Sequence, residues 1–172
     1  MKNTDYNVLY KKVFKILGEL TPLKVDCGAL CGCACCKGDD KTGMLLFPHE
    51  ESDLKVIKNE LGQRMVVCDG KCDRGKRPLA CRIFPFFPTI DENNKVFVEK
   101  DYRAVRLCPL LEHSDEIVFD PKFFKALKKV GKLIVKDAEC LEFLRSVTEE
   151  IDTYYDFYSS QIQVFVVPSE FR

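Results

Sequence analysis

The sequence predicts one helix-rich α+β domain, in which a small loop-rich cysteine region with short strands is supported by N- and C-terminal helices. Three observations lead to this fold class. The chain has 172 residues, of which 46% are hydrophobic and 31% charged, as is typical of a single globular domain. Apolar residues recur at helical spacing near both ends, and nine of the ten cysteines lie between residues 27 and 108. The predicted domain spans 1–172, with the cysteine region at 22–110 and the C-terminal helices at 120–158.

The first part of the chain is predicted to contain two helices and two short strands. An apolar stripe with lysines on the opposite face predicts an amphipathic helix over residues 6–20. Residues 42–47 and 65–67 are predicted as short strands. Between these strands, a proline at the first helical position and a glycine just after the last one predict a second helix over about 48–61.

The second part is predicted to contain a short helix, a hairpin and two longer helices. The short helix begins at Pro78, and an Asn-Asn pair predicts a tight turn within a hairpin over residues 89–98. An aspartate followed by proline begins a helix over 120–134, and a further apolar stripe predicts another over 137–158. The ending, 161–167, is predicted as a terminal strand or a partner-binding tail.

Charge and hydropathy exclude several classes of function. Lysine plus arginine and aspartate plus glutamate each total 27, and this balance argues against a chain that coats nucleic acid or anionic membrane. The longest apolar runs span four residues, whereas a membrane-spanning helix needs roughly 20. Since the N-terminus has no continuous apolar export signal, we expect a cytoplasmic location.

The cysteines are the strongest functional signal. In a reducing compartment, clustered thiols indicate a metal site more than a disulfide framework, and 13 phenylalanines distinguish the chain from a metallothionein. Without the isolated Cys140 and the odd Cys33, eight cysteines remain as candidate ligands. These eight are Cys27, Cys31, Cys35, Cys36, Cys68, Cys72, Cys81 and Cys108. Eight thiolates supply two four-cysteine centres or one larger polynuclear cluster, holding either Zn²⁺ or iron-sulfur.

The spacing adds detail without naming the metal. Glycines within residues 27–35 argue against a helix there, so we expect a loop that presents its cysteines inward. The adjacent side chains of Cys35 and Cys36 usually diverge, which favours two different metals or two corners of a cluster. The largely apolar stretch 82–86 is predicted to shield the centre from water.

Basic residues surround the second group of cysteines. Five lie from Lys71 to Arg82, against one acidic residue, and Arg103 and Arg106 precede the last predicted ligand. Positive neighbours favour ionised sulfur, although a solvated basic loop has the same composition. No recognition helix or aromatic interleaving supports nucleic-acid contact. His49 remains open as a further ligand.

Two segments resemble a known family. Residues 26–50 (DCGALCGCACCKGDDKTGMLLFPHE) and 68–88 (CDGKCDRGKRPLACRIFPFFP) resemble the YkgJ-type cysteine-cluster proteins, known by a CxxCxxCC signature and described as zinc- or iron-chelating. Flagellin lysine N-methylases carry a related cluster. The resemblance implies that the eight candidate cysteines are the family's cluster cysteines. The first gaps here have three residues where the short signature has two, and Cys33 is an extra thiol.

Two functions follow from the sequence. The first is a cysteine-ligated metal-binding or interaction module, whose partners are the metal ion and another protein. The alternative is an iron-sulfur enzyme related to protein lysine N-methylases that uses S-adenosylmethionine, although no Gly-rich nucleotide loop follows a strand. The sequence does not decide whether the protein is an enzyme. The vicinal pair and the apolar cover favour iron-sulfur in the native protein, with zinc filling the same thiolates after aerobic expression.

Overall fold

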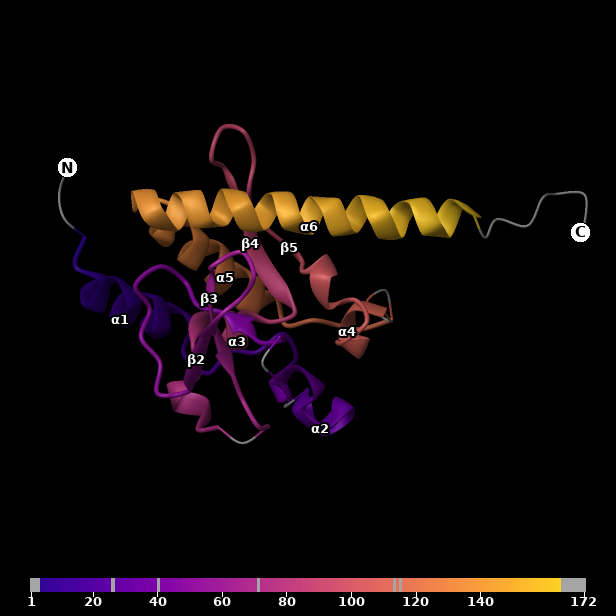
Figure 1. Cartoon of the computed structure of the whole chain (residues 1–172), viewed down its shortest axis with the longest axis horizontal. Coiled ribbons are helices and arrows are strands. Elements are labelled where there is room, and N and C mark those ends of the chain that lie inside the picture. The colour runs from indigo at the N-terminus through magenta and orange to yellow at the C-terminus, as the bar shows by residue number, and fades with distance from the viewer. Residues whose placement is uncertain are drawn as a thin grey trace, which may run out of the picture.

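The computed structural model confirms the helix-rich α+β class (Figure 1). It describes residues 4–25, 27–39, 41–70, 72–112, 114 and 116–164. The α-helices are α1 (Tyr6–Leu17), α2 (Gly28–Cys31), α3 (Leu79–Ile83), α4 (Pro109–Glu112), α5 (Pro121–Ile134) and α6 (Ala138–Val164). The strands are β1 (Met44–Leu45), β2 (Lys55–Lys58), β3 (Arg64–Val67), β4 (Phe86–Ile90) and β5 (Val96–Lys100). Three short 3-10 turns are η1 (Ala34–Cys36), η2 (Arg74–Lys76) and η3 (Tyr102–Ala104).

The main core lies between three helices and the β4–β5 hairpin. Helix α1 packs on α5, α5 covers both strands of the hairpin, and α6 packs against β4. The strands pair antiparallel, with Ile90 opposite Val96. Helix α5 approaches β5 closely at Gly131, where a Cβ atom would lie only 2.5 Å from Val96 Cγ1. Both the predicted hairpin and the predicted α5 are therefore confirmed.

Helix α6 is longer than the sequence predicted. Asp137 accepts a hydrogen bond from Cys140 N at 3.0 Å at its start, and the helix continues to Val164. Its C-terminal half extends past the rest of the domain in Figure 1. Part of the predicted terminal segment is thus helical, while 165–167 lie outside the described residues. Although α6 has 27 residues, no described helix is long and apolar enough to cross a membrane.

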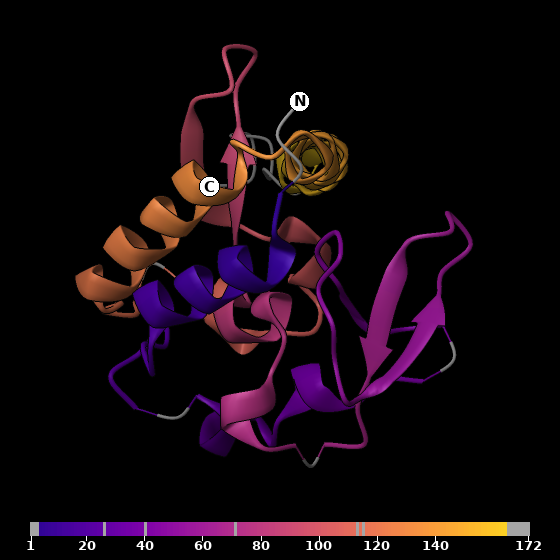
Figure 2. The same ribbon diagram turned by 90° about the vertical axis from the view of Figure 1, so that its left-hand side faces the viewer.

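A second, three-stranded sheet belongs to the cysteine region. Its order is β1–β3–β2, with both pairs antiparallel. Figure 2 shows this sheet to one side of α1, α5 and α6. Its main backbone contact with a helix joins β1 to α3. The cysteine region is therefore attached to the core at one edge instead of being wrapped by helices.

The predicted helix over residues 48–61 is wrong, because this segment contains β2 and the turn that leads to β3. Gly62 has a positive φ of 76°, which suits both a helix C-cap and a tight turn. The side chain of Asn59 closes the turn by accepting from Gln63 N at 2.8 Å. Glu50, which lies within the predicted helix, is buried. Gly62 therefore belongs to the turn between β2 and β3 and does not end a helix.

Candidate metal centre

Two short helical turns carry the first group of cysteines. Helix α2 ends at Cys31, after which Gly32 and Cys33 both have positive φ values, 60° and 56°. These residues reverse the chain before η1, which holds Cys35 and Cys36. No continuous helix runs through residues 27–35, as predicted, but single helical turns replace the expected loop.

Three distant segments supply the other four candidate ligands. Cys68 directly follows β3, with Cys72 four residues later, while Cys81 lies on α3 and Cys108 precedes α4. Backbone hydrogen bonding joins the first two groups, because Gly38 N donates to Cys68 O at 3.0 Å. The fold thereby gathers residues that are up to 81 positions apart in the sequence (108 − 27).

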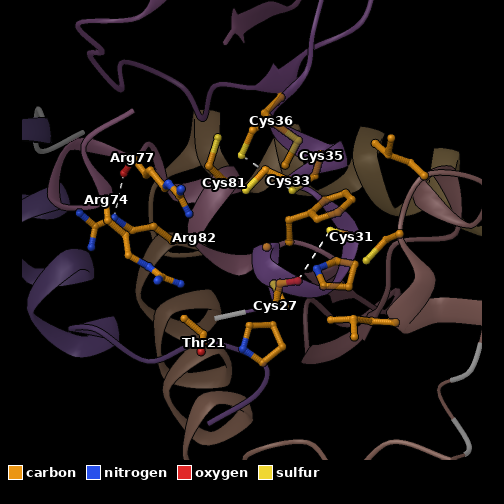
Figure 3. A pocket seen from close by; sticks show the side chains of 18 of the residues that line it. Thr21, Cys27, Cys31, Cys33, Cys35, Cys36, Arg74, Arg77, Cys81 and Arg82 are labelled. Carbon is orange, nitrogen blue, oxygen red and sulfur yellow. Dashed lines mark hydrogen bonds between the residues drawn. The ribbon is translucent and has the colours of Figure 1, made fainter. Parts of the chain in front are cut away.

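All eight predicted ligands line one or both of two pockets, the first of which is drawn in Figure 3. The first, of about 80 Å³, is lined by Cys27, Cys31, Cys33, Cys35, Cys36, Cys81 and Cys108. The second, of about 20 Å³, is lined by Cys35, Cys36, Cys68, Cys72 and Cys81. The two pockets adjoin, since three cysteines line both.

The strongest interaction of Cys35 is with Cys36, so the eight thiols form one connected cluster, and assigning this vicinal pair to different centres would divide them into two sets of four. Charge interactions connect Cys35 and Cys108 to the same two thiols of the first turn, whereas Cys68 and Cys81 both interact with Cys36. The first set is Cys27, Cys31, Cys35 and Cys108, and the second is Cys36, Cys68, Cys72 and Cys81. The sets meet at the vicinal pair, whose Sγ atoms lie 4.0 Å apart.

Cys35, Cys81 and Cys108 are hard to ionise without a metal. Burial raises the pKa of Cys108 to about 11 and raises that of Cys81 further, because the nearby Cys36 and Cys72 add to the effect. The pKa of Cys35 is raised first by its interaction with Cys36 and then by burial. In the metal-free state these thiols are therefore protonated at neutral pH, and binding of a cation would favour the thiolate.

Arginines lie on one side of the cysteines (Figure 3). Arg77 Nε donates to Cys72 Sγ at 3.2 Å. Although burial opposes it, this hydrogen bond and the neighbouring thiols raise the pKa of Arg77. Arg82 stacks over Phe14 at 4.7 Å and donates through Nε to Arg77 O at 2.8 Å. Arg77 is thus the direct positive neighbour of sulfur, and Arg82 holds the loop that carries it.

Apolar residues cover the first pocket. Phe84 and Pro85 line it, consistent with part of the predicted apolar shield. Phe86, in contrast, packs into the main core, where its ring meets Phe119 edge-on. Leu107 and other apolar side chains from the start of α4 and the segment after α1 complete the wall. Only the contacts from the segment after α1 lie far from the cysteines in the sequence, and spacing gave no signal for them.

The residues left open by the sequence occupy different surroundings. Cys33 lines the first pocket, and Cys140 is fully buried in the main core, apart from the cluster. His49 stacks on Tyr6 and its Nε2 lies 2.8 Å from Glu139 Oε2, so it lines neither cysteine pocket. His113 and the basic Lys71 lie outside the described residues.

The donor set fits a thiolate-bound metal in its chemistry. All ten cysteines are among the described residues, and none forms a disulfide. Soft sulfur donors select zinc and iron-sulfur clusters over calcium or magnesium. Within the described part of the chain, no three Cys, His, Asp or Glu side chains converge as a ready-made metal site. Binding would therefore draw the sulfur atoms of each set closer together.

In comparisons with family models, curated proteins and solved structures, nothing matches this chain. The YkgJ-type resemblance therefore stays a prediction that rests on the two cysteine-containing segments.

Proposed function

We propose that the protein is a metal-binding module with two neighbouring four-cysteine centres. The observation that supports this most directly is the arrangement of the eight predicted cysteines. They come from four separate parts of the chain and line two adjoining pockets, and assigning Cys35 and Cys36 to different centres gives each centre four thiolates. Four thiolates complete a closed tetrahedral site, and such a site cross-links a segment that has little core of its own.

We propose that the native protein holds iron-sulfur clusters and that Zn²⁺ replaces them after aerobic expression. Both are held by four cysteines. The Arg77–Cys72 hydrogen bond supports an anionic centre, because a cationic donor to a ligating sulfur compensates its charge. Apolar cover from Phe84 limits water at the sulfur atoms. Membership of the YkgJ-type family and a protein partner belong to the same proposal.

The alternative is an iron-sulfur enzyme related to protein lysine N-methylases that uses S-adenosylmethionine. Such an enzyme needs room for a substrate next to its cluster. One observation favours this function, namely a separate cavity that also has Cys35 in its wall. The cysteine site itself leaves no ligand position open if each metal takes four thiolates.

Serine substitutions in each set test the division. We expect Cys108→Ser and Cys68→Ser each to lower bound metal by about half, for example from about two zinc ions per chain to about one. The double variant should retain almost none. Cys140→Ser is the matched control, because Cys140 is buried away from the cluster, and its metal content should equal that of the wild type.

Metal content measured after anaerobic reconstitution gives the result directly. If either single variant loses all of its metal, the eight cysteines form one polynuclear centre and the division into two sets is wrong. If neither variant loses metal, Cys68 and Cys108 are not ligands. The Sγ atoms of Cys35 and Cys36 lie 4.0 Å apart, close to the roughly 3.8 Å edge of a zinc-thiolate tetrahedron. If both bind the same metal ion, the wild type would hold about one zinc ion per chain instead of two.

A further inference from the structure

A cavity of about 550 Å³ lies between the three-stranded sheet and the wall formed by η3 and α6. Small-molecule sites usually measure about 300–1,000 Å³, so this volume suits a ligand. Cys35 lines the cavity as well as both cysteine pockets. A ligand bound here would therefore lie next to the candidate metal centre.

The floor of the cavity is apolar. Side chains from both sheets and from the loop after α3 form it, namely Met44, Leu45, Met65, Phe84, Phe86 and Phe87. Such a surface binds the apolar portion of a ligand by excluding water from it.

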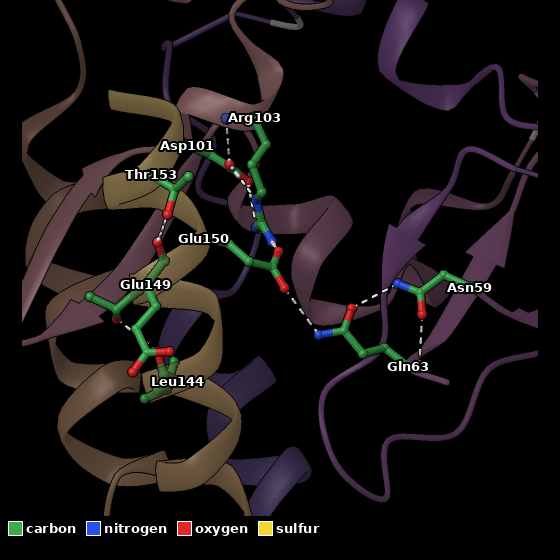
Figure 4. Close-up of polar contacts among 9 residues, drawn as sticks. Asn59, Gln63, Asp101, Arg103, Leu144, Glu149, Glu150 and Thr153 are labelled. Carbon is green, nitrogen blue, oxygen red and sulfur yellow. Dashed lines mark hydrogen bonds and ion pairs between the residues drawn. The ribbon is translucent and has the colours of Figure 1, made fainter. Parts of the chain in front are cut away.

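One polar wall carries an arginine paired with two carboxylates (Figure 4). Arg103 Nε lies 2.8 Å from Asp101 Oδ1, and its Nη1 lies 2.9 Å from Glu150 Oε2. Gln63 Nε2 donates to the other oxygen of Glu150 at 3.3 Å. Because Arg103 pairs with both carboxylates, this wall keeps a net charge of only −1.

Three further cations line the cavity. Lys37, Lys41 and Arg106 line the cavity with exposed side chains, and within the described residues these three side chains form no ion pair or hydrogen bond. Together with Arg103, the cavity has four cations against two carboxylates, Asp101 and Glu150, a difference of +2. A cleft lined by one sign of charge attracts the opposite sign.

We propose that this cavity binds a small anionic molecule with an apolar portion. Its carboxylate or phosphate group would contact Lys37, Lys41 and Arg106, while the apolar portion would lie on the floor. The proposal does not depend on metal at the cysteines, since the cations and the floor are separate from the predicted ligands. It adds a binding site to the module, at the place where a ligand could sense or react with the centre.

A pair of fluorescent probes tests the proposal on the full-length, zinc-loaded protein. Anilinonaphthalene sulfonate carries an apolar body with an anionic group, and N-phenylnaphthylamine is a similar neutral compound. We expect the anionic probe to bind at about one equivalent, more tightly than the neutral one and more weakly as salt increases. Arg106→Glu and Lys41→Glu should each weaken it by about tenfold, the effect of roughly one lost charge contact, and leave the neutral probe unchanged.

The control carries the same charge change elsewhere. Lys129→Glu lies on the exposed face of α5, outside the cavity, and should bind both probes like the wild type. Competition by inorganic phosphate and by acetate then shows which head group the cavity prefers. If both probes bind equally, if all three variants behave alike, or if neither probe binds the wild type, the proposal is overturned. The metal content of the same samples reports on the cysteine centres independently.

Discussion

Removal of the metal is expected to unfold the cysteine region while the helical core stays folded. The reason is the uneven distribution of buried apolar residues. Of the described residues from 24 to 78, only Phe47 belongs to the buried main core, whereas α1, α3, α5, α6 and the hairpin supply nearly all of the rest. A segment with so little core depends on cross-links for its folding.

Hydrogen exchange followed by mass spectrometry measures this effect by segment. After anaerobic chelation, amides in β2 and β3 should lose their protection almost completely. Amides in α5 and in α6 up to Ile151 should keep theirs, because Phe123, Leu127 and Val130 remain buried together. Zinc added back to the reduced protein should restore protection. Equal loss in both parts, or no loss at β2 and β3, would contradict a local structural role for the metal.

Loss of the Glu50 carboxylate should strongly destabilise the link between the cysteine region and α3. Glu50 is 1% exposed, and it accepts hydrogen bonds from Leu79 N at 2.6 Å and from Phe47 N at 3.2 Å. These bonds connect the cysteine region to the start of α3, which carries Cys81. Glu50→Ala leaves two buried N–H groups without partners, at a cost of about 2–4 kcal/mol in the free energy of unfolding.

Denaturant unfolding at constant metal content measures this cost. Glu51→Ala is the matched control, because the neighbouring Glu51 side chain is 86% exposed and only 3.9 Å from Arg64 in a surface ion pair. We expect the control to change the free energy of unfolding by less than about 0.5 kcal/mol. Equal effects of the two substitutions would mean that Glu50 does not hold α3 in place.

Glu50 should also make stability depend on pH. Burial raises its pKa from 4.5 to about 7, against the opposing effect of the two backbone donors. Since the folded chain holds this proton to a higher pH than the unfolded chain, the contribution of Glu50 to stability is greatest below pH 4.5 and falls until about pH 7. The total change is about 3 kcal/mol. Glu50→Gln should lack this slope, and identical pH profiles for the two proteins would disprove the shift.

The sequence predicted the elements that have strong local signals. The long stripes of α5 and α6 and the turn between β4 and β5 are determined by residues close together in the chain. At 48–61 the local signals were ambiguous, since a positive φ at Gly62 serves a helix end and a hairpin turn equally. The burial of Glu50 decides between them, and it depends on Leu79, which lies 29 positions away.

The sequence predicts which cysteines belong to the candidate site, but it does not predict their arrangement. Clustering was enough to select the eight cysteines, and all of them line the two pockets. Their grouping depends on how α3 and the segment before α4 fold back on the first turns, which spacing does not encode. Cys33 is a second example. The sequence analysis left it out of the eight candidate ligands, yet Cys33, with a left-handed backbone conformation, lines the first pocket.

Metal and sulfide analysis of protein purified without oxygen, together with its visible spectrum, tests the central claim most directly. The proposed iron-sulfur centres predict brown protein with about four irons and four sulfides for each centre. Colourless protein with about two zinc ions per chain would retain the two-centre arrangement with the other metal. Protein with neither metal, and with its cysteines oxidised, would contradict the assignment of the eight cysteines as ligands.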